Sequence, residues 1–255
     1  MKRKFGLATQ LLAGAVALAV NAPAGAAIAN FPTGNGELFI NIADRSAGVS
    51  YTRDLGIRMD DFIATAGTAR TFSPDALLSS TFGTTLGSSL RWDVLAGDDL
   101  GTNRYLSTTT ANQSAIDTQF NQSLLDMSIV QDFLTNVNGM APNDGDIALN
   151  VSKKFTSTDP GYFIPAIETW SGKSVFNNAA DVGTPMPMYL LTTSSTNPFG
   201  KILSTKLGTW DLAPNGTLSY SVAGAAPVPL PAAAWLMASG LVGLAGVARR
   251  RGGRA

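Results

Sequence analysis

Short segments in which apolar and polar residues alternate occur toward both ends of the central part of the chain. A period of two places every second side chain on the same face of a β-sheet. The segment Pro214-Asn215-Gly216 separates two such runs, and an Asn-Gly turn in that position predicts a β-hairpin. The alternating segments are 37–42, 49–52, 90–95, 209–212 and 217–222. They predict a mainly β domain over residues 30–226, arranged as a β-sandwich.

One segment of this domain repeats its apolar residues every three or four positions instead. The repeat includes Ile116, Phe120 and Leu134, and it ends before Asn138-Gly139. This spacing places the apolar side chains along one side of an α-helix. We therefore predict one long amphipathic helix over residues 113–137, with its apolar side packed against the sheet.

The first 29 residues have the composition of a secretory signal peptide. Three basic residues, at positions 2–4, precede an uncharged apolar stretch over 5–20. Small residues then supply two cleavage patterns of the A-x-A type, Ala24-Gly25-Ala26 and Ala27-Ile28-Ala29. The order of these features predicts export, with residues 1–29 as the signal peptide, and leaves both cleavage positions open.

A second uncharged segment lies near the C-terminus. Residues 232–248 contain no charged side chain, and Arg249, Arg250 and Arg251 follow them directly. Seventeen residues of α-helix span about 25 Å, which is close to the roughly 30 Å of a bilayer core. Basic residues remain on the cytoplasmic side of a membrane. We therefore predict a transmembrane helix that stops transfer at the three arginines and leaves the C-terminus in the cytoplasm.

The segment 227–255 resembles a known sorting signal. The run Val228-Pro229-Leu230-Pro231-Ala232, the apolar segment and the terminal arginines together are similar to the PEP-CTERM signal, most closely its VPLPA subtype. The resemblance implies recognition at Val228, Pro229, Leu230, Pro231 and Ala232 by an exosortase, a transpeptidase-like enzyme of the inner membrane. It also implies a Gram-negative bacterium, a transient inner-membrane anchor, and a final location at the cell surface or in a biofilm or floc matrix.

Charge and composition exclude several functional classes. The chain contains neither Cys nor His, which removes disulfides, thiolate metal sites and Ser-His-Asp triads. Between Glu37 and Asp211 there are 18 acidic and 11 basic residues, a net charge of −7. An acidic body lacks the clustered positive charge that nucleic-acid binding requires. We therefore expect no nucleic-acid partner.

The chemistry of the central domain provides few candidates. No nucleophile elbow, P-loop or dinucleotide-binding motif is present, so we predict no catalytic residue and no enzyme activity. Calcium is an alternative ligand, because Asn143-Asp144-Gly145-Asp146 and Ala96-Gly97-Asp98-Asp99 place oxygen atoms around glycine. Turn formation is the favoured explanation of both segments, and we predict no metal site and no required cofactor.

Aromatic side chains that stack on sugars are the remaining candidates. Trp170 lies in a loop-like segment and is the residue we select for carbohydrate binding, whereas Trp92 and Trp210 lie in alternating segments and are predicted to be core residues. The leading hypothesis is a structural protein of an extracellular polysaccharide matrix. The alternatives are a carbohydrate- or calcium-binding matrix module and, third, a matrix glycoside hydrolase that uses two acidic residues.

Overall fold

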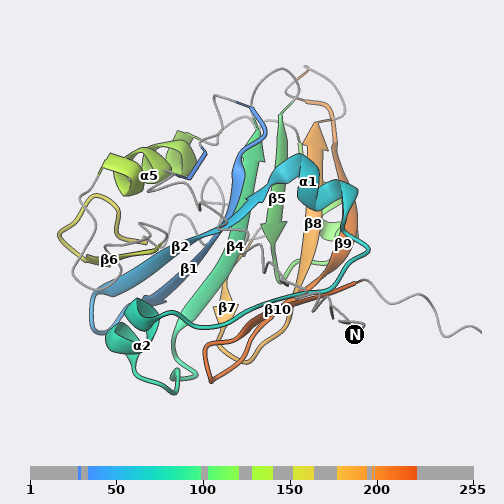
Figure 1. Ribbon diagram of the computed structural model, residues 1–255. Helices are drawn as coiled ribbons and strands as arrows, with labels where there is room; N and C mark the ends of the chain where they lie inside the picture. The colour runs from blue at the N-terminus through green and yellow to red at the C-terminus, as the bar shows by residue number, and fades with distance from the viewer. Residues whose placement is uncertain are drawn as a thin grey trace, which may run out of the picture.

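The computed structural model describes residues 28–29, 34–98, 103–120, 128–139, 152–163, 177–193, 197 and 199–222. Ten strands within this part of the chain form one antiparallel sheet, in the order β3-β10-β9-β8-β5-β4-β1-β2-β6, with β7 paired to β4 (Figure 1). The strands are β1 (Glu37–Asp44), β2 (Val49–Arg58), β3 (Arg70–Phe72), β4 (Arg91–Asp98), β5 (Arg104–Thr108), β6 (Ser152–Thr156), β7 (Ala180–Asp181), β8 (Met186–Thr193), β9 (Ile202–Leu212) and β10 (Leu218–Val222). The helices are α1 (Met59–Ala64), α2 (Ala76–Phe82), α3 (Gln113–Asp117) and α5 (Ser128–Gly139).

The prediction of a mainly β domain is confirmed. Each alternating segment lies within, or overlaps, a strand, and the Asn-Gly turn joins β9 to β10 as predicted. Gly216 has φ of 80°, a left-handed conformation that glycine adopts without steric strain. The turn fixes the hairpin register, which places Tyr220 opposite Trp210. Across the described residues the strands form one continuous curled sheet, whereas a sandwich has two separate sheets.

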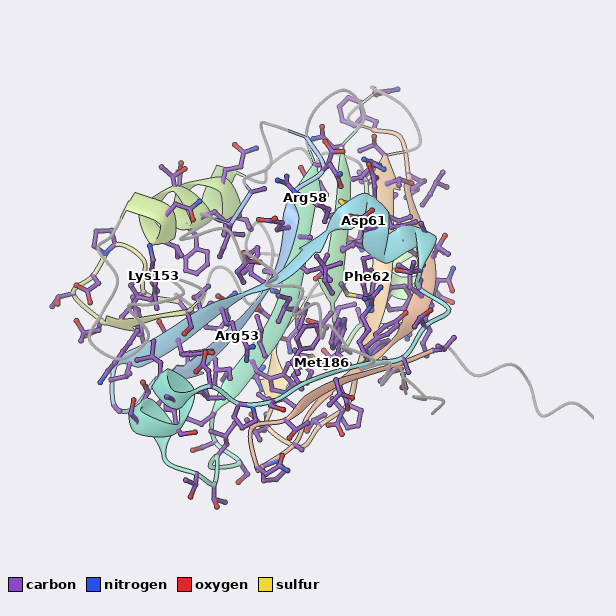
Figure 2. The ribbon with its side chains drawn as sticks, in the orientation of Figure 1. Arg53, Arg58, Asp61, Phe62, Lys153 and Met186 are labelled. Atoms are coloured by element: carbon purple, nitrogen blue, oxygen red, sulfur yellow. The ribbon has the colours of Figure 1, made fainter. Side chains whose placement is uncertain are left out.

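The curl of the sheet encloses a first core on its concave side. Phe62 of α1 stacks against Trp210, with ring centroids 6.0 Å apart, and meets the edge of Tyr220 at 5.0 Å. Figure 2 shows Phe62 and Met186 within this interior. The curl also brings β2 against the segment that follows β3, because the Tyr51 hydroxyl donates to Asp75 Oδ2 at 2.7 Å. The two ends of the sheet are therefore joined through side chains.

A second core covers the opposite face of strands β1, β4 and β5. Helix α5 lies over this face, and its buried residues are Val130, Phe133, Leu134 and Val137 (Figure 1). The ring of Phe133 lies 6.2 Å from that of Phe39 on β1. Because β1 is covered on both faces, six successive residues of it, Leu38–Ala43, are buried.

The prediction of one helix over 113–137 is wrong. Helix α3 ends at Asp117, the Gln119 carbonyl accepts from the Ile202 amide at 3.1 Å, and Phe120 pairs with Lys201 as an isolated β-bridge. This segment satisfies an edge of β9 that would otherwise lack hydrogen-bond partners. Phe120 consequently remains 49% exposed, whereas the apolar repeat had placed it on a buried helix side.

The described residues stop before the C-terminal tail. Among the helices within the described residues, none combines the length and the apolar character that crossing a bilayer requires. The predicted signal peptide lies outside the described residues up to position 27, and the predicted sorting signal over 227–255 lies outside them throughout. This places Val228–Ala232 and Arg249–Arg251 beyond the part of the chain that the structure describes.

Candidate ligand-binding site

The acidic residues proposed as calcium ligands are only partly within the described residues. Asp98 ends β4, and its buried carboxylate accepts from the guanidinium of Arg104. Arg104 also donates to Asp60 at 2.9 Å, and its hydrogen bond to the Asp98 carboxylate is the main reason that the pKa of Arg104 is raised. A guanidinium in this position competes with a cation for the Asp98 oxygen atoms. Asp99 and the segment 143–146 lie outside the described residues.

The described part of the chain contains no cluster of three or more acidic, His or Cys residues that would hold a metal ion. Glu37 and Asp54 are two acidic residues whose charges interact. Burial, together with the nearby charge of Glu37, raises the pKa of Asp54 to about 6, although the Gly56 amide donates to Asp54 and acts in the opposite direction. Glu37 itself contacts Arg58 at 3.2 Å. Both carboxylates are therefore engaged in contacts within the protein.

The aromatic residues are mostly core residues. Trp92 and Trp210 are completely buried, which confirms the prediction for both. Trp170, the residue selected for carbohydrate binding, lies outside the described residues. Four tyrosines are also buried, namely Tyr51, Tyr105, Tyr189 and Tyr220. These six buried side chains therefore present no ring face to a dissolved sugar.

The exposed aromatic rings in the described part of the chain are phenylalanines. Phe199 is 78% exposed, and Phe120 lies beneath the Lys201 ammonium, which is 3.9 Å from its ring centroid. Leu203, two residues after Lys201, is 56% exposed. The apolar repeat placed Phe120 on a helix and so did not predict that its ring is exposed beside Lys201. The pairing of Phe120 with Lys201, directly before β9, explains this position.

A row of buried polar residues crosses the sheet beneath the second core. The Thr52 hydroxyl donates to Asn41 at 2.7 Å, Asn41 donates to Asp93 at 2.9 Å, and Asn178 donates to the other oxygen of Asp93 at 2.8 Å. Lys153 is the register partner of Thr52 on β6 (Figure 2). Polar residues that alternate with apolar ones along a strand usually face solvent. Here α5 and the segment 177–179 cover that face of the sheet, so these polar residues are buried.

The charge state of this row follows from its burial. Asp93 is completely buried, and this raises the pKa of its carboxyl to about 8, although the hydrogen bonds from Asn41 and Asn178 act in the opposite direction. At the other end of the row, burial lowers the pKa of Lys153, whose ammonium donates to the Val137 carbonyl at 2.7 Å. A row with no exposed member is a structural element and not a surface for a ligand.

A cleft with a volume of about 270 Å³ lies beside α2. It lies where β1 and β2 meet in a tight turn, and Figure 1 shows α2 beside this end of the sheet. Its lining residues are Asp44, Ala47, Val49, Thr81, Phe82, Gly87, Ser89 and Leu90. A volume just below the usual range for drug-sized ligands suits a small ligand such as one sugar ring.

Comparison with protein-family models, with curated proteins and with solved structures finds no match to this chain. The function of the cleft must therefore be argued from its residues.

Among the residues that the structure describes, Asp44 is the only charged one that lines the cleft. Its Oδ1 atom accepts from the Ser46 amide at 2.9 Å and from the Ser46 hydroxyl at 2.6 Å, which form the turn between β1 and β2. The Ser46 hydroxyl and the Ala47 amide hold the pKa of the Asp44 carboxyl below its ordinary value. The carboxylate is therefore ionised at neutral pH and accepts hydrogen bonds from hydroxyl groups.

The remaining lining residues supply contacts of two kinds. Phe82, at the end of α2, is partly buried against the first core and provides the aromatic side chain of the cleft. Ser89 is exposed and provides a hydroxyl group, and buried Leu90 supplies an apolar contact. An aromatic side chain beside a carboxylate and a hydroxyl is suited to a ligand with one apolar and one hydroxylated face.

Proposed function

We propose that this chain is an exported protein of the cell surface or extracellular matrix, sorted by an exosortase-type transpeptidase at the inner membrane. The observation that carries the proposal is the order of three features at the C-terminus. The segment Val228–Ala232, the uncharged run over 232–248 and the cluster Arg249–Arg251 follow one another without interruption. In this proposal the first is recognised, the second is retained in the bilayer and the third stops transfer.

The position of the last strand supports accessibility of the tail. Strand β10 ends at Val222, which is 39% exposed, so the chain leaves the folded body at its surface. Val228 follows Val222 by six positions, and an extended chain of that length spans at most about 20 Å. The folded body therefore stays close to the membrane while the motif is processed.

The stop-transfer role is tested by changing Arg249, Arg250 and Arg251 to Ser together. Without these charges we expect the precursor to leave the membrane fraction and appear in the soluble or extracellular fraction. The matched control changes three basic residues of the body, Arg45, Lys154 and Lys206, to Ser, which removes the same charge and leaves fractionation unchanged. Unchanged membrane retention of the tail variant would contradict the proposal, and the intact mass of surface-recovered protein shows whether both termini have been removed.

A second candidate function, carbohydrate binding, is favoured by the cleft beside α2. Asp44 accepts hydrogen bonds from sugar hydroxyls, and the Phe82 ring contacts the apolar face of a sugar. The proposed ligand is one residue of the extracellular polysaccharide, and no cofactor is required for this binding.

Asp44→Asn tests this function because asparagine preserves the turn and removes the charge. We expect an affinity about tenfold lower for the host exopolysaccharide in affinity electrophoresis, since a hydrogen bond to a charged group contributes about 1.5 kcal/mol or more. Asp211→Asn, a substitution on β9, is the control and leaves mobility unchanged. Equal mobility of the wild type and the Asp44 variant would exclude the cleft as the binding site.

A further inference from the structure

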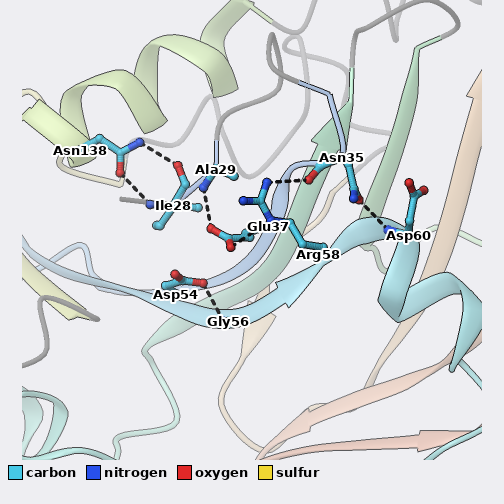
Figure 3. Close-up of polar contacts among 9 residues, drawn as sticks. All are labelled: Ile28, Ala29, Asn35, Glu37, Asp54, Gly56, Arg58, Asp60 and Asn138. Carbon is cyan, nitrogen blue, oxygen red and sulfur yellow. Dashed lines mark hydrogen bonds and ion pairs between the residues drawn. The ribbon is translucent and has the colours of Figure 1, made fainter. Parts of the chain in front are cut away.

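Ile28, inside the predicted signal peptide, is held by the folded body. The Ile28 amide donates to Asn138 Oδ1 at 3.1 Å, and Asn138 Nδ2 donates to the Ile28 carbonyl at 2.9 Å (Figure 3). Asn138 belongs to α5, which covers the second core, and Ile28 is itself 7% exposed within that core. Both polar groups of the Ile28 backbone are thus hydrogen-bonded to Asn138, and the Ile28 side chain is packed in the second core.

Ala29 is held in a similar way at the start of β1. Its amide donates to Glu37 Oε2 at 2.7 Å, and its carbonyl accepts from the Glu37 amide at 3.1 Å (Figure 3). Gly36 allows this approach, because a Cβ there would lie 3.2 Å from the Ala29 carbonyl oxygen and 2.2 Å from that of Gly97. Ala29 is therefore hydrogen-bonded to both the side chain and the backbone of Glu37, the first residue of β1.

We propose that the export peptidase cleaves the Ala26–Ala27 bond, so that Ile28 and Ala29 remain in the mature protein. Small residues precede both this bond and the bond after Ala29, and the sequence pattern accepts either. Cleavage after Ala29 would remove the partners of the Asn138 amide and one partner of the Glu37 carboxylate, and it would empty the place of Ile28 in the second core. Partly buried polar groups that lose their hydrogen-bond partners destabilise the fold.

The reaction is an ordinary hydrolysis. Water adds a hydroxyl to the Ala26 carbonyl carbon as the C–N bond breaks, and Ala27 leaves with a new α-amino group. The inference rests on the export proposed above. It ends the signal peptide at residue 26, whereas the sequence pattern allows it to end at residue 26 or at residue 29.

N-terminal sequencing of the full chain, expressed in a Gram-negative host and recovered separately from the cytosol and from the exported fractions, tests this directly. The expected first residue is Ala27. A protein that begins at Asn30 would overturn the cleavage position and leave export intact. A protein that begins at Met1 would overturn export itself and, with it, this inference.

Matched substitutions at the two candidate bonds provide a second test. A leucine directly before a bond does not fit the small-residue requirement of the peptidase. We expect Ala26→Leu to abolish the product that begins at Ala27, and Ala29→Leu to leave that product unchanged. Processing that survives Ala26→Leu with its normal start, or that is lost in Ala29→Leu, overturns the proposed position.

Hydrogen exchange of the mature protein distinguishes a held segment from a loose one. The Ile28 and Ala29 amides donate to Asn138 and Glu37, so we expect their exchange to be at least tenfold slower than that of an open chain. Asn138→Ala should accelerate exchange at Ile28 by a similar factor. Asn136→Ala, on the same helix as Asn138, removes a hydrogen bond to the Pro160 carbonyl. It is the control and should leave exchange at Ile28 unchanged. Unprotected amides in the wild-type protein would overturn the inference.

Discussion

Gly208 on β9 lies so close to β10 that a side chain does not fit there. A Cβ at this position would lie 2.4 Å from the Tyr220 hydroxyl oxygen and 2.5 Å from the Ser221 carbonyl oxygen. We expect Gly208→Ala to lower the free energy of unfolding by about 1–3 kcal/mol, because the hairpin must shift to accept the methyl group. Urea denaturation measures this, and Gly139→Ala, where nothing lies within 4 Å, is the control with no loss. Equal midpoints for both variants would show that the hairpin adapts freely.

Two buried carboxyls should make stability depend on pH. The pKa of Asp93 is raised to about 8 and that of Asp54 to about 6, both through burial. The folded state therefore holds protons that the unfolded chain releases near pH 4, and this stabilisation is complete below that value. We expect the free energy of unfolding to fall as pH rises from about 4 to 8, by an amount of the order of a few kcal/mol, and then to level off. The chain contains no His, so no imidazole contributes in this range.

Asp93→Asn isolates the contribution of the upper part of that range. Asparagine is neutral at every pH, and its amide can donate to Asn178 Oδ1, a buried atom that has no partner within the described residues. We expect the free energy of unfolding of this variant to stay constant between pH 6 and 8, whereas that of Asp211→Asn should still fall over this range. Guanidinium denaturation at several pH values provides the measurement. A decline of the same size in Asp93→Asn would assign it to other groups.

Among the elements, α2 joins the two ends of the sheet through its N-cap. Asp75 accepts from the Leu78 amide at 2.8 Å and, through its other oxygen, from the Tyr51 hydroxyl of β2 at 2.7 Å. We expect Asp75→Ala to lower the free energy of unfolding by about 2–3 kcal/mol, since it removes a cap and leaves a buried hydroxyl without its acceptor. Asn112→Ala removes only the N-cap of α3, in which Asn112 accepts from the Ala115 amide. This change should lower the free energy of unfolding by about 1 kcal/mol.

Chemical denaturation of both variants gives the difference between them. That difference measures what the link between α2 and β2 contributes beyond capping. If Asp75→Ala were no more destabilising than Asn112→Ala, the Tyr51 bond would contribute nothing to closing the sheet.

The elements also show how far the sequence alone could predict this fold. Strands that alternate toward one covered face, such as β10 with Leu218 and Tyr220 buried, were predictable from local periodicity. The end of α3 was not, because its cause is an unpaired edge of β9 more than eighty residues away. The burial of Asn41 and Asp93 was not predictable for a related reason, since alternation along one strand does not reveal that α5 covers its polar face.

The candidate sites follow the same rule. The sequence indicated the core positions of Trp92 and Trp210, and it offered Asp98 as a possible calcium ligand. It did not indicate that the Asp98 carboxylate accepts a hydrogen bond from Arg104. The cleft beside α2 combines the β1–β2 turn with residues about forty positions later, so no local motif indicates it. The predicted terminal signals depend on composition and order and not on contacts, so they are argued from the sequence alone.

At the scale of the whole molecule, the two cores share the same strands. Along β1, Leu38, Ile40 and Ile42 face the first core, and Phe39 and Ala43 face the second. Strand β4 divides its residues in the same way, with Val94 in one core and Leu95 in the other. A disturbance of either core therefore displaces strands that the other core requires, and this arrangement favours a single cooperative unfolding transition.

Phe133→Ala tests this coupling, because Phe133 belongs to the second core and the buried Trp92 and Trp210 belong to the first. Removing a buried phenylalanine ring costs about 3–5 kcal/mol. In a background with Trp170 and Trp235 changed to Phe, we expect the tryptophan fluorescence midpoint in urea to fall together with the circular dichroism midpoint. Leu203→Ala, at a side chain 56% exposed, is the control and should move neither midpoint. A fluorescence midpoint that stayed in place while the dichroism midpoint fell would mean that the cores unfold separately, and that β1 and β4 do not transmit the loss.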